Sequence, residues 1–174
     1  MIIIVMGVSG SGKTTLGKQL ALCLNWEFQD ADGFHAPAQI AKMRQGIPLT
    51  DADRAPWLQR LRVSIEQWQA AQCSVVLACS ALKARYRHQI DPNEQCQWVY
   101  LQGSFELFQH RLAQRLDHYM PASLLQSQFE SLEEPQNAIV VGAALPIAVL
   151  VQQVKAQLDL DIPAISLEEN SLES

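Results

Sequence analysis

The chain has few cysteines, a deficit of basic residues and no long apolar run, and each scarcity argues against a class of protein. Its 4 cysteines form no Cys-x-x-Cys pair, so we expect buried free thiols rather than disulfides or a zinc site. There are 13 Lys and Arg against 18 Asp and Glu, and this balance disfavours nucleic-acid binding. The longest apolar stretch, 138–151, contains Gly142 and Pro146 and is too short to span a bilayer, so no membrane partner is expected.

The remaining composition is that of an ordinary globular domain. The chain has 174 residues, of which 48% are hydrophobic and 18% charged, which is enough to build one full core. We expect a single domain over residues 1–160 and an acidic, weakly ordered tail over 161–174. Because the first apolar strand begins at Met1 or Ile2, no signal peptide is recognised, and a cytoplasmic location is expected.

Strand-like and helix-like segments alternate along the chain, which is typical of an α/β fold with a parallel sheet. We expect strands at Ile2–Met6, Glu27–Gln29, Ser74–Cys79, Gln97–Leu101 and Ala138–Val141. We expect helices at Lys13–Leu24, Pro37–Gln45, Arg54–Ala71, Leu82–Ile90, Phe105–Arg115, Ala122–Ser131 and Pro146–Leu158. In such folds the functional residues follow the carboxyl ends of the strands.

Residues 7–14, GVSGSGKT, match the phosphate-binding P-loop at every fixed position. An apolar strand precedes them and leucines at helical spacing follow, which favours a P-loop over an ordinary Gly/Ser-rich turn. The glycines let backbone N–H groups turn inward around an anion at a helix N-terminus. We therefore expect residues 7–15 to bind the phosphates of a nucleoside triphosphate: Gly7, Val8, Ser9, Gly10, Ser11, Gly12, Lys13, Thr14 and Thr15. Lys13 would contact the β- and γ-phosphates, and Thr14 would ligate Mg²⁺.

Two carboxylates, Asp30 and Asp32, follow the second expected strand. Phosphoryl transfer to an alcohol needs a carboxylate that accepts the hydroxyl proton, and an acid that holds hydrated Mg²⁺. The alternative is a solvated Asp-Gly turn, but the nearby P-loop favours function. Many P-loop enzymes carry an aspartate for the metal after the third strand, where this chain has Cys79 and Ser80. We therefore assign Asp30 to the metal and Asp32 to the proton.

Basic residues lie near the same expected edge of the sheet. Arg54 is a candidate clamp for an anionic substrate, and Lys83 and Arg87 are expected on one face of the next helix. Arg111 and Arg115 lie four residues apart before a loop, which suits a lid that closes over the phosphates. For each group, solvated charges on a helix surface remain the alternative.

Several further segments are distinctive. They are Asp30-Ala31-Asp32 with His35, Lys42-Met43, the segment DADRAPWL over 51–58, the segment CSALK over 79–83 with Tyr86-Arg87, then His118, Ser127-Gln128-Phe129 and Glu133 with Pro135. With the P-loop, these segments resemble the gluconate kinases, relatives of the shikimate and nucleoside-monophosphate kinases. The resemblance runs from about Ile2 to Leu158. The chain departs from the usual family pattern at three positions: Ala36 stands in place of Pro, Gln39 in place of Asn, and Gly142 in place of Asp.

The resemblance implies a three-layer α/β/α P-loop kinase with a mobile lid, often dimeric. Such enzymes use ATP and Mg²⁺ to phosphorylate the 6-hydroxyl of D-gluconate. Carried over by position, the catalytic residues are Lys13, Asp32, Arg111 and Arg115. The substrate-binding residues are Asp32, His35, Lys42, Arg54, Ser80, Lys83, Arg87, His118 and Gln128. A kinase for another small acid or a nucleotide, and a sugar-acid sensor without turnover, remain the alternatives.

Overall fold

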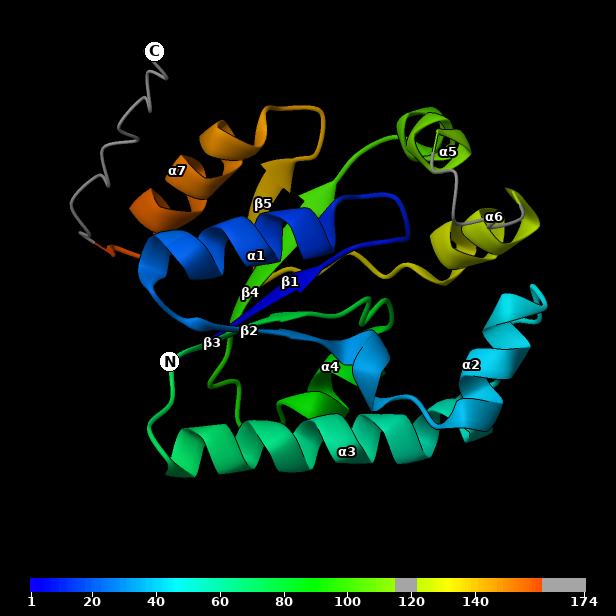
Figure 1. Cartoon of the computed structure of the whole chain (residues 1–174), viewed down its shortest axis with the longest axis horizontal. Helices are drawn as coiled ribbons and strands as arrows, with labels where there is room; N and C mark the ends of the chain where they lie inside the picture. The colour runs from blue at the N-terminus through cyan, green and yellow to red at the C-terminus, as the bar shows by residue number, and fades with distance from the viewer. Residues whose placement is uncertain (115–121, 161–174) are drawn as a thin grey trace, which may run out of the picture.

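The computed structural model describes residues 1–114 and 122–160, which contain one parallel sheet and its covering helices. The strands are β1 (Ile2–Met6), β2 (Glu27–Asp30), β3 (Val75–Ala78), β4 (Gln97–Gln102) and β5 (Ile139–Gly142). Their order in the sheet is β2-β3-β1-β4-β5, and every neighbouring pair is parallel. The first strand of the chain therefore lies at the centre, so the loop after it opens in the middle of the carboxyl edge (Figure 1). The expected α/β class and five-stranded parallel sheet are confirmed.

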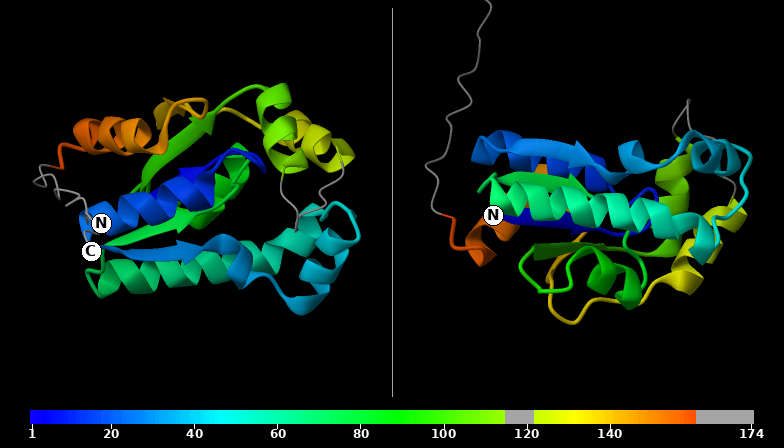
Figure 2. Two further views of the ribbon diagram at one scale, coloured as in Figure 1. Left: turned by 45° about the horizontal axis from the view of Figure 1, so that its top comes forward. Right: turned by 90° about the horizontal axis from the view of Figure 1, so that it is seen from below.

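Helices cover both faces of this sheet. They are α1 (Lys13–Leu24), α2 (Pro37–Arg44), α3 (Asp51–Ala70), α4 (Ala84–Ile90), α5 (Phe105–Ala113), α6 (Ala122–Ser131) and α7 (Ile147–Gln157), with a short 3₁₀ helix, η1 (Ala31–Phe34). Helices α1 and α7 pack together on one face, and α3 and α4 on the other. Helices α2, α5 and α6 lie at the end toward which the strands point (Figure 2). None of the helices in the described ranges combines the length and apolarity needed to cross a bilayer.

The central strand shows why both faces need cover. Ile3 and Val5 belong to the apolar cluster that contains the buried leucines of α1 and the buried valines of α7, whereas Ile2 and Ile4 belong to the cluster of α3 and α4. Neighbouring side chains of a strand point to opposite faces, so a strand buried on both sides must be apolar throughout. All five residues of β1 are buried, and this rigid strand holds the base of the P-loop.

Most expected boundaries agree with the observed ones to within two residues, and three differences lie near the cavity. Helix α3 begins at Asp51 rather than Arg54, because Thr50 and Asp53 form a capping box: the Thr50 hydroxyl accepts from the Asp53 amide, and the Asp53 carboxylate accepts from the Thr50 amide. Residues 31–34, expected as a loop, form η1, capped by the Asp30 carboxylate. The expectation that Lys83 and Arg87 share a helix face is wrong, because Lys83 is extended and precedes α4.

Candidate active site

A cavity of about 580 Å³ opens at the carboxyl edge of the sheet. Its walls come from the P-loop, from the segments after β2 and β3, from residues 47–51 with the start of α3, and from α6. The cavity therefore lies where the functional residues of an open parallel sheet are expected. It brings together eleven of the residues predicted from the sequence to form the site: Ser9, Gly10, Lys13, Thr14, Asp30, Asp32, His35, Arg54, Ser80, Lys83 and Gln128.

The P-loop has the backbone geometry of an anion nest. Gly10 and Gly12 have φ angles of 80° and 101°, in the left-handed region that favours glycine. A Cβ atom on Gly10 would lie 2.9 Å from the carbonyl oxygen of Phe108, so α5 packs directly against the loop. Gly12 immediately precedes α1, and the loop therefore ends at a helix N-terminus, where anions bind. The side chain of Thr15 is exposed and does not line the cavity.

Lys13 and Arg111 place two cations around the P-loop. The Lys13 Nζ atom donates to the Val8 carbonyl at 3.0 Å, so this side chain folds back across the loop. Arg111 of α5 donates to the Ser11 carbonyl at 3.2 Å and to the Ala143 carbonyl, after β5, at 2.7 Å. The guanidinium of Arg111 thus links the P-loop to the segment that follows the edge strand β5. Arg115 and His118, which were predicted with it, lie outside the described residues.

Thr14 and Asp30 lie together beside the P-loop. The Thr14 hydroxyl donates to Oδ2 of Asp30 at 3.0 Å, and Oδ1 of Asp30 accepts from the Asp32 amide at 3.1 Å. Hydroxyl and carboxylate oxygens are ligands that Mg²⁺ accepts. Within the described ranges, no three His, Cys, Asp or Glu side chains gather as a cage for a metal. The pair therefore fits a hydrated ion that takes its other ligands from phosphate and water.

Cys79 and Ser80 follow β3 at the floor of the cavity. Burial, and then the nearby Asp32 carboxylate, raise the pKa of the Cys79 thiol to about 12. The thiol is therefore protonated at neutral pH and is neither a nucleophile nor an anionic ligand. This supports the assignment of the metal-binding acid to Asp30.

We call the part of the cavity lined by Asp32, His35, Arg54, Ser80 and Lys83 the acceptor side. Lys83 Nζ lies 3.4 Å from Oδ1 of Asp51, and Arg54 donates to the Leu49 carbonyl. The arginine and lysine both lie over the ring of Tyr86, at 5.7 and 5.5 Å from its centroid.

Asp51, the first residue of α3, was not among the predicted site residues. Its carboxylate accepts from the Tyr86 hydroxyl and pairs with Arg85 as well as Lys83. The hydrogen bond from Tyr86, and then that from Arg85, lower the pKa of Asp51 to about 2. Asp51 therefore stays ionised and holds Lys83 of the acceptor side.

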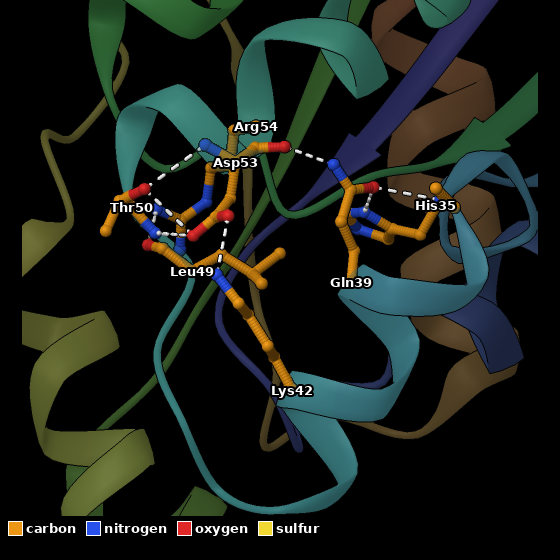
Figure 3. A network of polar contacts seen from close by, with 8 residues as sticks. His35, Gln39, Lys42, Leu49, Thr50, Asp53 and Arg54 are labelled. Carbon is orange, nitrogen blue, oxygen red and sulfur yellow. Dashed lines mark hydrogen bonds and ion pairs between the residues drawn. The ribbon is translucent and has the colours of Figure 1, made fainter.

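Two predicted substrate residues do not line the cavity. Lys42 pairs with Asp53 at 2.7 Å, on the outer side of the capping box of α3 (Figure 3). Arg87 donates from Nη1 to the carbonyls of Ala81 and Leu82, at 3.0 and 3.1 Å. The structure thus places Arg87 behind the loop that carries Ser80 and Lys83.

Gln128 lies on α6, directly over the P-loop. Its Oε1 accepts from the Ser9 amide at 2.7 Å, and its Nε2 donates to the Ser9 hydroxyl at 3.0 Å. It was predicted as a substrate residue, and its contacts place it on the phosphate side of the cavity instead. Sequence reasoning noted Gln39 only as a departure from the family pattern and gave it no role in the site.

The comparisons with known proteins agree with this geometry. The sequence model of the family described as "Shikimate kinase" matches residues 9–140. A gluconokinase of Gluconobacter oxydans is 46% identical, with 76% of this chain and 75% of that protein covered. A probable gluconokinase of Xenopus tropicalis is 40% identical, with 91% of this chain and 94% of that protein covered. The chain belongs to the gluconokinase family.

A solved structure supports the same relationship. A sugar kinase from Janibacter superposes with a TM-score of 0.85 at 41% identity, covering 92% of this chain and 95% of that one. The P-loop, the Thr14–Asp30 pair and the acceptor side thus stand on the fold of a small-molecule kinase, as the sequence indicated.

Proposed function

We propose that the protein transfers the γ-phosphoryl group of ATP to the 6-hydroxyl of D-gluconate, giving 6-phospho-D-gluconate and ADP. The observation that carries this proposal is one cavity with two chemically different ends. Lys13 and Thr14 lie at the phosphate-binding end, and Asp32 lies on the acceptor side with two basic residues, Arg54 and Lys83. The choice of gluconate as the acceptor rests on the relatives described as a gluconokinase and a probable gluconokinase, which align with this chain over most of their length.

At the phosphate end, the backbone of residues 7–14 and the Lys13 ammonium would hold the triphosphate. Arg111 lies close enough to the loop to stabilise charge that develops on the transferred group. Thr14 and Asp30 would hold Mg²⁺, which supplies charge neutralisation of the phosphate oxygens. These residues fix the triphosphate in position before transfer, which is the main requirement of this chemistry.

At the acceptor side, Asp32 is the proposed proton acceptor. The substrate oxygen forms a bond to the γ-phosphorus, the bond from that phosphorus to the β–γ bridging oxygen breaks, and the hydroxyl proton passes to the Asp32 carboxylate. The backbone amide of Asp32 donates to the Asp30 carboxylate, so the backbone of Asp32 is fixed relative to the Thr14–Asp30 pair. The proposed proton acceptor and the proposed metal-binding carboxylate thus lie on one short segment at the end of β2.

The far end of gluconate is an anion, and Arg54 and Lys83 are the residues that we propose to bind it. A guanidinium binds a carboxylate through two parallel hydrogen bonds, and an ammonium adds a mobile positive charge. Asp51 offsets part of this charge and holds Lys83 toward the cavity wall. A neutral sugar would offer no anion to either cation.

The proposal is tested by ADP release with a panel of acceptors at equal concentration: gluconate, shikimate, glycerate, glucose and nucleoside monophosphates. Gluconate is expected to give the highest kcat/KM, and mass spectrometry should show one added phosphoryl group. Faster turnover of any other acceptor would replace gluconate in the proposal, and binding without ADP release would leave a sensor. We also propose, from the family pattern, a cytoplasmic homodimer; light scattering after size-exclusion chromatography tests the dimer.

A further inference from the structure

Gln39 of α2 joins the two segments that form the acceptor side. Gln39 is buried, with only 7% of its surface exposed, and its side-chain amide lies between the end of η1 and the start of α3 (Figure 3). The Oε1 atom of Gln39 lies 2.9 Å from the Ala36 amide nitrogen and 3.1 Å from Nδ1 of His35. Its Nε2 atom contacts the carbonyl oxygen of Asp53. The histidine and the start of α3 are therefore held by a single amide group.

Backbone groups settle the orientation of this amide. The Ala36 N–H is only a donor, so the atom of Gln39 that faces it must be the oxygen. The Asp53 carbonyl is only an acceptor, so the atom that faces it must be the nitrogen. The two contacts indicate the same orientation of the Gln39 amide. If its oxygen and nitrogen were exchanged, a donor would face the Ala36 N–H and an acceptor would face the Asp53 carbonyl.

The orientation of the amide fixes the protonation of His35. Because Oε1 of Gln39 can only accept, the Nδ1 atom of His35 must carry the proton. The ring cannot turn freely, because it stacks on Trp57 with centroids 4.6 Å apart and planes 6° from parallel. Trp57 is itself fixed by a 2.8 Å hydrogen bond from Nε1 to the Ala31 carbonyl.

Burial, with the charges of Arg54 and Arg60, keeps the His35 ring neutral at neutral pH. Burial lowers the pKa of His35 below 6.5, and Arg54 and Arg60 lower it further. The Gln39 hydrogen bond and the Asp32 carboxylate act in the opposite direction, and the net shift is downward. With Nδ1 protonated and the ring neutral, Nε2 carries a lone pair.

We propose that Gln39 is a positioning residue that holds His35 as the neutral Nδ1–H tautomer, so that Nε2 accepts a hydrogen bond from a hydroxyl of the acceptor substrate. His35 lines the cavity, and Nε2 is the ring nitrogen that Gln39 leaves available. The other contact of Gln39 is to the carbonyl of Asp53, the residue before Arg54. It therefore fixes the position of His35 relative to Arg54. The site thereby favours a polyol that donates to His35 and carries its anion toward Arg54. The identity of that polyol rests on the proposed function.

The tautomer is measured without any substrate. In protein labelled with ¹⁵N-histidine, the chemical shifts of the two ring nitrogens distinguish a protonated from an unprotonated atom. The chain has 4 histidines, and the signals of His35 are identified by their loss in His35→Gln. We expect a protonated Nδ1 and an unprotonated Nε2 at pH 7.5. In Gln39→Met the Nδ1 acceptor is absent, and the pattern should move toward the Nε2–H form, which free histidine prefers. A native protein with a protonated Nε2, or an unchanged pattern in Gln39→Met, would overturn the proposal.

Kinetics test the consequence for the substrate. Gln39→Met should raise the gluconate KM by about 3- to 10-fold, the effect of one neutral hydrogen bond, and leave the KM for ATP unchanged. The matched control is Gln45→Met, because Gln45 is exposed at the end of the same helix. A shifted tautomer with an unchanged gluconate KM would overturn the role in substrate binding. If gluconate is not phosphorylated at all, the proposed function fails, while the ring-nitrogen shifts still test the tautomer.

Gln39→Glu gives a second test if the methionine variant folds poorly. The carboxylate still accepts from Ala36 and from Nδ1 but no longer donates to the Asp53 carbonyl, and its charge should raise the pKa of His35. The gluconate KM should then rise as pH falls through the raised pKa, because protonation removes the lone pair of Nε2. Gln45→Glu adds the same charge away from the ring and should follow the native pH profile. A Gln39→Glu profile identical to that of Gln45→Glu would contradict the proposal.

Discussion

The Thr14 hydroxyl lies 3.0 Å from the carboxylate of Asp30, at the point where the start of α1 meets the end of β2. Two oxygen-bearing side chains that suit Mg²⁺ thus lie together beside the P-loop. We expect Thr14→Val and Asp30→Asn each to raise the Mg²⁺ concentration for half-maximal activity by roughly 10-fold or more, because each removes one ligand or its charge. Mg²⁺ titrations at saturating ATP measure this. Asp159→Asn, beyond the end of α7, is the matched control and should titrate as the native enzyme does. An unchanged Mg²⁺ requirement in both variants would exclude this metal site.

Lys13 is expected to act mainly in the transition state, because charge accumulates on the transferred group as the bond to ADP breaks. We expect Lys13→Ala to lower kcat by about 10²- to 10³-fold while thermal unfolding stays near that of the native protein. Lys18→Ala, on the exposed side of the same helix, controls for loss of a lysine. Near-native turnover in Lys13→Ala would show that phosphoryl transfer occurs elsewhere.

Asp32 and Asp30 should be separable by their kinetic effects. Asp32→Asn preserves the shape of the side chain but removes its basicity, so kcat should fall by roughly 10²-fold with little change in the Mg²⁺ requirement. Asp30→Asn should alter the Mg²⁺ requirement first. If the two variants show the opposite pattern in the same titrations, the roles assigned to these carboxylates are reversed.

The order of elements could be predicted from the sequence because local patterns determine it. The apolar run of β1 and the P-loop that follows it were placed correctly, and so was α1. Both depend on residues close in the chain: a strand buried on two faces must be apolar, and the loop needs glycine at positions with positive φ.

The contacts around the acceptor side could not be predicted in the same way. Gln39 joins His35 to the carbonyl of Asp53, and Asp51 meets Tyr86, 35 residues further along the chain. Such contacts depend on how α2, α3 and α4 pack, which residue spacing does not give. The role of Arg87 shows the converse: its charge suggested an anion site, but its donors are used by the carbonyls of Ala81 and Leu82.

The capping box of α3 predicts a specific loss of stability in acid. The hydrogen bond from Lys42, and then those from Thr50, lower the pKa of Asp53 from 3.8 to about 2. Because the folded pKa is lower than the unfolded one, the contribution of Asp53 is complete above about pH 5 and is lost as the pH falls toward 2. Thr50→Ala should lower the free energy of unfolding by about 1 kcal/mol at pH 7. Urea unfolding at pH 7 and pH 3 measures both effects. Asp53→Asn should show a smaller acid loss than the native protein; an equal loss would assign the acid sensitivity to other carboxylates.

Lys83 and Arg87 stand close in the chain but should give different kinetic signatures. Lys83 lines the cavity, so Lys83→Ala should raise the gluconate KM, by about 10-fold for one charge-assisted hydrogen bond, and change the KM for ATP little. Arg87 holds the carbonyls behind the same loop and does not line the cavity, so Arg87→Met should chiefly lower thermal stability.

The matched control for both variants is Arg62→Ala, because Arg62 forms an exposed ion pair with Glu66 on α3, at 2.8 Å, and such pairs contribute little. Steady-state kinetics with gluconate and ATP varied separately, together with thermal melts, distinguish the roles. A gluconate KM that stays native in Lys83→Ala but rises in Arg87→Met would reverse this assignment. It would mean that the loop after β3 turns in solution so that Arg87, rather than Lys83, meets the carboxylate of the substrate.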